Sequence, residues 1–130
     1  MNVNNKLEPI RILVFSASLS KNSLNKQLVK IAADIIEQNG GEVELETMKS
    51  FDTPSFNQDL EAEGFYPRGA TNLKERLLAS DGFIIASPDY NGSISGVLKN
   101  TIDWISRWRP QPFKGHQARL ISASPSVAGG

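Results

Sequence analysis

The sequence predicts a doubly wound α/β domain, in which helices cover both faces of a parallel β-sheet. Short apolar runs rich in β-branched and aromatic residues alternate with helix-period segments along the chain. Such runs are typical of strands buried on both faces of a sheet. Strict alternation of strand and helix favours right-handed crossovers between parallel strands. A length of 130 residues fits one domain.

The elements follow a polar stretch, residues 1–9, which we expect to be a flexible tail preceding a domain at 10–130. We expect strands at 11–16, 42–48, 82–87 and 119–122, and helices at 24–38, 69–80 and 95–107. The helices are predicted from apolar residues spaced three and four apart. The intervening segment 49–68 contains two prolines and a glycine, and it is predicted as a long, mostly irregular loop.

Two of these elements carry more detailed expectations. Strand 42–48 alternates apolar residues with glutamates, so we expect it near an edge of the sheet. For helix 24–38 the spacing predicts an apolar face made of Leu24, Leu28, Ile31, Ala32, Ile35 and Ile36. For helix 95–107 it predicts a buried stripe made of Val97, Leu98, Ile102 and Ile105.

Composition excludes several classes of function. Fourteen basic residues balance fourteen acidic ones, so no net charge favours nucleic acid or an anionic membrane as partner. The absence of cysteine excludes disulfides, thiol nucleophiles and cysteine metal sites, and it fits a reducing compartment. The apolar runs are too short to span a bilayer. We therefore expect a cytoplasmic protein with neither a membrane segment nor a metal site.

The loop after the first strand has a composition that suits a phosphate. Residues 16–25 hold four serines, two asparagines and one lysine, directly before a helix begins. Backbone N–H groups are unpaired at a helix N-terminus and the dipole there is positive, so short donors at this place favour an anion. Helix capping by Ser23 explains the same residues. The glycine spacing of dinucleotide-binding and P-loop motifs is absent, and both interpretations stay open.

The loop after the third strand, residues 87–93, suits a planar ring. Pro88 fixes a rigid exit from the strand, and Tyr90 offers a flat apolar surface with a polar tip. Asn91 and Gly92 permit positive φ, which lets successive backbone N–H groups aim at acceptor atoms such as those of a flavin. An ordinary strand-to-helix turn with a surface tyrosine is the competing interpretation.

Taken together, the two loops resemble the NADPH-dependent FMN reductase family, whose members have a flavodoxin-like fold. The family's first-loop pattern, Gly-Ser-Leu-Arg-x-x-Ser-x-Asn, is matched by residues 17–25, with Ala17 in place of the glycine and Ser20 in place of the arginine. Its second pattern, Pro-Glu-Tyr-Asn-x-Ser-x-Pro-Gly-x-Leu-Lys-Asn-x-Ile-Asp-Trp, is met by residues 88–104, with Asp89 for glutamate and Ser95 for proline. Residues 56–61 and 123–130 also resemble family loops.

The resemblance implies a set of cofactor-binding residues. The phosphate of FMN would be held by residues of the first loop, namely Ser18, Ser20, Ser23, Leu24 and Asn25. The isoalloxazine ring would be held by residues of the second, namely Pro88, Asp89, Tyr90, Asn91, Gly92 and Ser93. Ser124 would lie beside the ring or the ribityl chain. No catalytic side chain is implied, because the flavin carries the difficult chemistry.

The resemblance also implies a function. It is that of an oxidoreductase enzyme, which transfers hydride from NADPH or NADH through bound FMN to a quinone, a flavin or a similar small acceptor. Such proteins usually assemble as homodimers or homotetramers. Family members usually continue beyond the fourth strand, so the implied flavodoxin-like sheet lacks its last strand and helix. The alternative is an FMN-binding electron-transfer or redox-sensing module with little reductase turnover.

Overall fold

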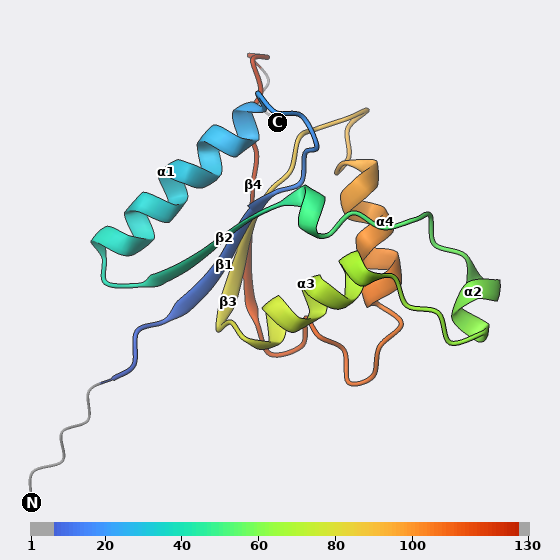
Figure 1. Ribbon diagram of the computed structural model, residues 1–130. Helices are drawn as coiled ribbons and strands as arrows, with labels where there is room; N and C mark the ends of the chain where they lie inside the picture. Colours follow the sequence, from blue (N-terminus) through green and yellow to red (C-terminus); the bar gives the residue numbers. More distant parts are fainter. Residues whose placement is uncertain (1–6, 128–130) are drawn as a thin grey trace, which may run out of the picture.

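Four parallel strands form the centre of the structure, a computed structural model that describes residues 7–127 (Figure 1). The strands are β1 (Arg11–Ser16), β2 (Glu42–Thr47), β3 (Gly82–Ala86) and β4 (Gln117–Ile121). Their order in the sheet is β2-β1-β3-β4, which is the flavodoxin-like order through its fourth strand. The strand order switches between β1 and β3: β2 lies on one side of β1, and β3 and β4 lie on the other. Ligands of such folds bind beyond the carboxyl ends of the strands at this switch point.

Helices cover both faces of this sheet, which confirms the doubly wound prediction (Figure 1). Helix α1 (Leu24–Gln38) lies on one face, and α3 (Arg68–Leu78) and α4 (Gly96–Ile105) lie on the other. Because side chains alternate along a strand, β1 and β3 supply both cores. The larger core, on the side of α3 and α4, includes Leu13, Phe15, Phe83 and Ile85, and the smaller, under α1, includes Val14 and Ala86.

Helix α1 has the predicted bounds, but its buried face differs from the expected one. Its buried residues are Asn25, Val29 and Ala33, whereas Ile31 and Ile35 are 57% and 54% exposed. The predicted face is therefore wrong in part. Apolar residues of α1 cover two adjoining stripes, and their spacing specifies the helical period without specifying which stripe meets the sheet.

The segment predicted as a long irregular loop contains two short helices. A 3₁₀ turn, η1 (Met48–Ser50), follows β2 directly, and α2 (Gln58–Ala62) begins after the capping residue Asn57. Arg107 donates a hydrogen bond to Glu61 of α2 at 2.7 Å, and this bond raises the pKa of the Arg107 guanidinium. The prediction missed both helices because each is too short to show a period in the sequence.

The two edges of the sheet are unequal. Strand β2 lies at one edge, as predicted, and β4 lies at the other. Strand β4 begins two residues earlier than expected, and its Leu120 is 66% exposed. Residues 7–9 belong to no helix or strand, and the rest of the predicted tail, like Gly129 and Gly130, lies outside the described residues. Within residues 7–127, no helix is long and apolar enough to cross a membrane.

Candidate cofactor site between two strand-end loops

The loops that follow β1 and β3 are joined at the carboxyl edge of the sheet. The Ala17 amide donates a hydrogen bond to the carbonyl of Ala86 at 2.8 Å, which extends the pairing of the two strands. Ser95, only 2% exposed, donates its hydroxyl to the Ala17 carbonyl at 2.7 Å. Its backbone N–H donates to the hydroxyl of Ser87 at 3.2 Å. Ser95 thus connects the loop after β1 through its side chain and the start of the loop after β3 through its backbone.

These contacts give a structural meaning to the exchange of proline for serine at position 95. Ser95 has φ −61°, a value that proline also adopts, and it immediately precedes α4. A proline would have neither the hydroxyl nor the N–H that make the two hydrogen bonds. The serine therefore keeps the backbone geometry and adds one hydrogen bond between the two loops and one within the loop after β3.

Residues 90–93 form a tight turn that presents free backbone amides. Asn91 has φ 56° and Gly92 has φ 73°, which confirms the expected positive φ at both positions. The amides of Tyr90 and Ser93 are paired with each other's carbonyls, at 3.0 and 3.2 Å. Within the described part of the chain, the amides of Asn91 and Gly92 donate to no acceptor. Two adjacent N–H groups at this turn are therefore available to a ligand.

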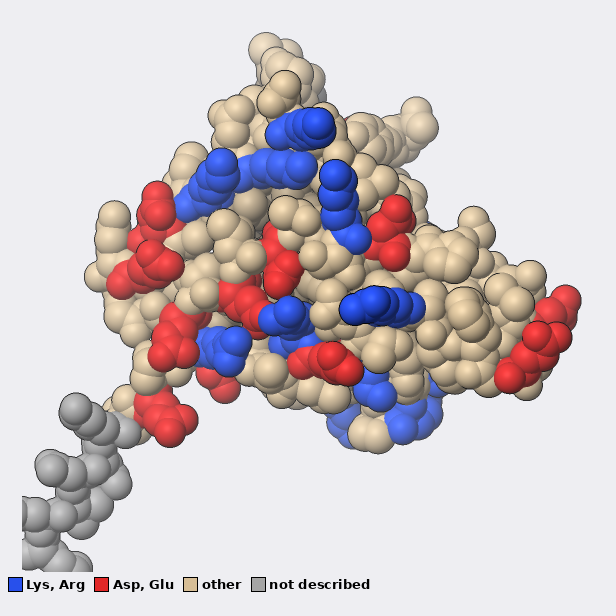
Figure 2. All heavy atoms as spheres, viewed as in Figure 1, with Lys and Arg blue, Asp and Glu red and all other residues tan. Residues whose placement is uncertain are grey.

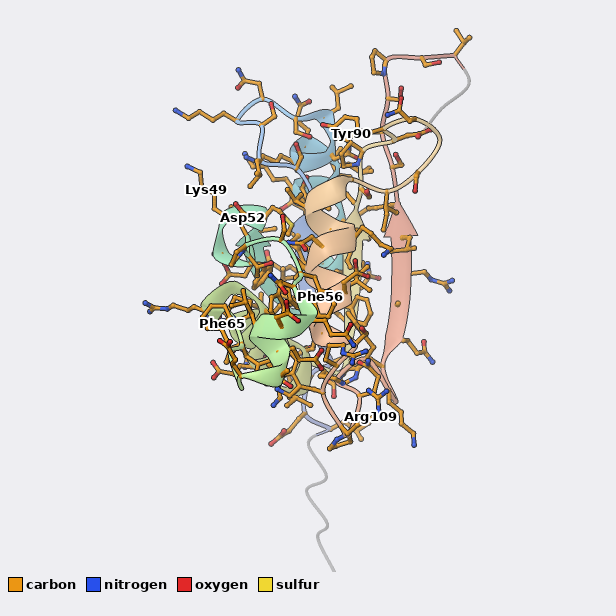
Figure 3. All side chains as sticks on the ribbon, turned by 90° about the vertical axis from the view of Figure 1, so that its right-hand side faces the viewer. Lys49, Asp52, Phe56, Phe65, Tyr90 and Arg109 are labelled. Atoms are coloured by element: carbon orange, nitrogen blue, oxygen red, sulfur yellow. The ribbon has the colours of Figure 1, made fainter. Side chains whose placement is uncertain are left out.

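A hollow of about 190 Å³ separates the two loops. The loop after β1 contributes Ser18 and Ser20 to its wall, and the loop after β3 contributes Tyr90, which is 55% exposed. The remaining wall residues are Ala17, Leu19, Ser95, Gly96 and Val97. Tyr90 lies above α4 near the top of the view in Figure 3, whereas Phe56 and Phe65 lie lower down. The structure thus brings together three of the residues predicted to bind the cofactor.

Gly96 lines the same hollow and is unusual among the glycines of the described chain. Each of the others has a positive φ, or would place a Cβ against protein atoms, or both. Gly96 has no positive φ, and a Cβ added to it would meet no heavy atom within 4 Å. Neither backbone conformation nor packing within the protein requires a glycine here. A ligand that approaches the backbone at the start of α4 would require one.

A larger cavity, of about 410 Å³, lies on the other side of the loop after β3. Predicted residues in its wall are Pro88, Asp89, Gly92 and Ser93, joined by Ser87, Ile94, Leu120, Ile121 and Ser122. The loop that the sequence singles out therefore stands between two cavities. Residues from β4 were not predicted to take part, because nothing in that short strand differs from ordinary strand residues.

The other predicted residues lie apart from these two cavities. Ser23 caps α1 by accepting a hydrogen bond from the Asn25 amide at 3.1 Å, as the capping interpretation predicts. The buried carboxamide of Asn25 bonds the Ala123 backbone twice, at 3.2 and 2.9 Å. It thereby holds the segment that carries Ser124, whose hydroxyl accepts from the Ser126 amide. Leu24 is exposed at the first position of α1 and offers only its backbone.

Within residues 7–127, no three His, Asp or Glu side chains gather in a way that could hold a metal ion. The walls of both cavities consist of serines, backbone, one tyrosine, one aspartate and apolar side chains. Such a lining, apolar with a few placed polar groups, is typical of a site for an organic ligand.

Comparison with known proteins identifies the family. The family model described as NADPH-dependent FMN reductase matches residues 10–130. An NAD(P)H-dependent FMN reductase of Pseudomonas aeruginosa is 37% identical over 117 residues, which are 90% of this chain and 61% of that protein. An NADPH:quinone oxidoreductase of Arabidopsis thaliana is 34% identical over 121 residues, which are 93% of this chain and 61% of that protein.

A solved structure gives the same result. FerB, a flavoenzyme NAD(P)H:(acceptor) oxidoreductase from Paracoccus denitrificans, matches with a TM-score of 0.75 and 35% identity, over 91% of this chain and 63% of that one. The chain thus spans about three fifths of the length of these relatives. Sequence patterns, strand order and all three comparisons agree, and the chain belongs to the NADPH-dependent FMN reductase family.

Proposed function

We propose that this chain forms the FMN-binding part of an NAD(P)H-dependent oxidoreductase that reduces a quinone, a flavin or a similar small acceptor. The observation that carries this proposal is the hollow lined by Ser18, Ser20 and Tyr90, which come from two loops far apart in the sequence. Its position, beyond the carboxyl ends of β1 and β3, is where doubly wound folds bind their ligands. The names of the relatives support the same reaction class.

The residues present fit the ring of a flavin. The free amides of Asn91 and Gly92 suit the acceptor atoms of its pyrimidine part, and they would stabilise negative charge there. The exposed ring of Tyr90 suits stacking against a planar heterocycle. Gly96 leaves the backbone at the start of α4 open to close approach. When bound, FMN would supply the hydride chemistry, and the protein would position it.

The residues proposed for the phosphate are neutral. Ser18 and Ser20 offer hydroxyls, Leu24 offers its amide at the N-terminus of α1, and Ser23 adds its hydroxyl. Asn25, by holding the backbone of Ala123, would bring Ser124 toward the site. Pro88, Gly92 and the backbone amides of 88–93 would complete the enclosure, joined by Asp89 and Ser93 at the larger cavity.

One observation favours a second candidate function. The hollow contains no lysine or arginine among its wall residues, because Ser20 stands where the family pattern has arginine. A neutral wall holds a phosphorylated nicotinamide nucleotide less strongly than a wall with an arginine fork does. The second candidate is therefore an FMN-binding electron-transfer or redox-sensing module with little reductase turnover.

Assembly and compartment are part of the proposal as well. We propose that the protein acts as a homodimer or homotetramer, as the family resemblance implies. The absence of cysteine is compatible with a reducing compartment such as the cytoplasm, which we propose as its location.

The visible spectrum of the purified chain with added FMN tests the proposal. A flavin spectrum that stays with the protein after gel filtration supports FMN binding, and its absence would contradict both candidate functions. If NADPH or NADH bleaches the spectrum of the bound flavin in the absence of oxygen, and a quinone then reoxidises the flavin, the result supports the oxidoreductase function. A bound flavin that neither nucleotide bleaches favours the electron-transfer module.

Two variants connect that test to the site. Tyr90→Ser removes the exposed ring from the hollow, and we expect it to reduce the amount of retained FMN. Phe65→Ser removes an aromatic ring of comparable exposure that lines neither cavity and lies lower in the view of Figure 3, and it should retain FMN as the unmodified chain does. Equal retention by both variants would contradict a role for Tyr90.

A further inference from the structure

Helix α1 carries an apolar stripe that lies exposed on the surface of the described chain. Leu24, Ile31 and Ile35 are 41%, 57% and 54% exposed, and Leu28, between them, is half-buried. These four residues form what we call the outer stripe, and they share one side of the helix because they are spaced four, three and four apart. That side differs from the one that α1 buries against the sheet. Single apolar side chains are common on a surface, whereas a continuous stripe is typical of a contact with another surface.

The outer stripe is complementary to itself. Its spacing is that of the seam of a coiled coil, in which apolar residues recur at alternating intervals of three and four. In an antiparallel pair of α1 helices related by a two-fold axis, Leu24 lies opposite Ile35 of the second copy, and Leu28 lies opposite Ile31. Both pairs are centred on the same point of the helix, between residues 29 and 30. All four apolar residues therefore meet apolar residues, as a two-fold interface requires.

A groove of about 370 Å³ continues the outer stripe at the C-terminal end of α1. Its wall consists of four isoleucines and the turn after the helix, namely Ile10, Ile12, Ile35, Ile36 and residues 39–41. Ile10 is itself 61% exposed, so the apolar surface extends from the helix to the residue that precedes β1. In the antiparallel pair, Leu24 of the second copy lies opposite Ile35 and would enter this groove. The groove thus provides the hole that a knob from the second helix needs.

Charge is divided along α1 in a way that suits the same arrangement. Lys21, Lys26 and Lys30 lie in or just before its N-terminal half, and its C-terminal half holds Asp34 and Glu37. Figure 2 shows basic side chains over the first half and acidic side chains toward the other end. This order is opposite to the one that the helix dipole favours. Within residues 7–127, none of these five side chains forms an ion pair. An antiparallel second helix brings the acidic half of one copy beside the basic half of the other.

We propose that the outer stripe is an interface between two copies of this chain, whose α1 helices pack antiparallel across a two-fold axis. This inference rests on the homo-oligomer of the proposed function and assigns its contact surface, while it requires no bound flavin. Helix α1 has 15 residues and is about 22 Å long, so the pair buries an area at the low end of the range for specific complexes. We therefore expect a dissociation constant on the order of 10 µM.

Sedimentation equilibrium of the unmodified full chain, from about 1 to 300 µM and both with and without FMN, tests the association itself. We expect reversible association to a dimer in both conditions. A chain that stays monomeric throughout overturns the proposal and leaves the outer stripe to a different polypeptide. A monomer that retains FMN would contradict the interface alone, and a dimer that binds no FMN would support the interface while contradicting the flavin site. The two failures are therefore distinguishable.

Matched variants locate the interface. Ile31→Lys and Ile35→Lys place a charge in the outer stripe, and each should weaken association roughly tenfold or more. Leu78→Lys makes the same change at a leucine of similar exposure, 59%, at the end of α3, and it should leave association unchanged. At about 1 µM, below the expected dissociation constant, the urea midpoints of all three variants should stay close to that of the unmodified chain, because the replaced side chains are already exposed. Equal association of Ile35→Lys and Leu78→Lys would overturn the assignment, even where the unmodified chain is a dimer.

Cross-linking tests the antiparallel order, because the chain contains no cysteine of its own. Gln27 and Asp34 are exposed and border the outer stripe on the same side, so in the antiparallel pair each lies beside the other residue of the second copy. A mixture of Gln27→Cys and Asp34→Cys chains should form covalent dimers with a short bis-maleimide far more readily than either variant alone. Cross-linking that is equally efficient within each variant would indicate parallel helices and overturn the antiparallel interface.

Discussion

At the scale of single residues, Ser95 and Gly96 differ in what they contribute at the start of α4. Ser95 uses its hydroxyl to join the loops after β1 and β3, and its amide to close the loop after β3 onto Ser87. Gly96 makes no comparable contact, and a Cβ there would meet open space. Contacts within the protein therefore account for Ser95, whereas for Gly96 they do not, and the proposed flavin would account for it.

Replacing Ser95 by alanine removes the hydrogen bond to the Ala17 carbonyl and leaves that of the Ser95 amide. We expect the free energy of unfolding to fall by about 1 to 2 kcal/mol, since a buried carbonyl loses its donor. Urea unfolding with an unchanged m value measures this. The control is Ser55→Ala at an exposed serine, which should stay within about 0.5 kcal/mol. Equal stability of both variants would contradict the joining role of Ser95.

Replacing Gly96 by alanine separates stability from binding. Alanine at a helical position with an ordinary φ is expected to raise the free energy of unfolding by about 0.4 to 1 kcal/mol. The added methyl group would enter the hollow, so FMN affinity should fall roughly tenfold. Urea unfolding and quenching of flavin fluorescence measure the two effects. An alanine variant that binds FMN as well as the unmodified chain shows that no ligand approaches this backbone.

At the scale of elements, α4 holds the long segment between β2 and α3. Asn100 accepts a hydrogen bond from the Phe56 amide at 2.7 Å, and its Nδ2 lies within 3.1 Å of acceptors on Thr53 and Pro54. Trp104, fully buried, donates to the Pro54 carbonyl at 2.9 Å. Much of the family pattern in residues 88–104 therefore stabilises the fold, and only its first part lines the cavities.

Replacing Asn100 by leucine keeps a side chain of similar size and removes every hydrogen bond that Asn100 makes to residues 53–56. We expect a loss of about 2 to 3 kcal/mol, because the partly buried Phe56 amide and Thr53 carbonyl lose their partner at once. The measurement is urea unfolding, joined by limited proteolysis of residues 52–66. Lys99→Leu, at an exposed neighbour with one surface ion pair, should change stability by less than about 1 kcal/mol. Comparable losses in the two variants would refute the anchoring role of Asn100.

The elements with a clear period could be predicted from the sequence, and those without one could not. Apolar runs located β1 and β3 to within a residue, and the spacing in residues 24–38 gave the bounds of α1. Two apolar stripes on α1 left its buried face ambiguous. Helix α2 has five residues, fewer than two turns, and its anchoring by Arg107 depends on a contact that no local pattern encodes.

The parts of the candidate site that depend on the backbone preferences of single residues could be predicted from the sequence. The positive φ values of Asn91 and Gly92 follow from their residue types. The hydrogen bonds of Asn25 to Ala123 join residues far apart in the sequence, and only the folded chain reveals them. The unpartnered hydroxyl of Ser16 likewise has no sequence signal, because a serine at the end of a strand usually finds a partner.

At the scale of the whole molecule, three cavities border the carboxyl edge of a single sheet. Two lie on either side of the loop after β3, and the third lies between α1 and β2. If the first two hold FMN, binding should stabilise the entire fold, because a ligand that binds only the folded state shifts the unfolding equilibrium.

Thermal unfolding with FMN and with riboflavin measures this coupling. FMN at a hundredfold excess over its dissociation constant should add about 2.7 kcal/mol and raise the melting temperature by several degrees. Riboflavin lacks the phosphate, so at the same concentration it should stabilise less if Ser18, Ser20 and Ser23 hold that group. Identical shifts for the two compounds would contradict a phosphate site in the loop after β1.

The location of the flavin is the central claim, and backbone amide NMR during an FMN titration tests it most directly. We expect the amides of Ser18, Ser20, Asn91, Gly92 and Gly96 to shift together and to saturate at one equivalent. Amides in β2 and α3, away from the two loops, should keep their positions. Saturating shifts confined to other parts of the chain, or no saturation at all, would contradict a flavin site between the loops after β1 and β3.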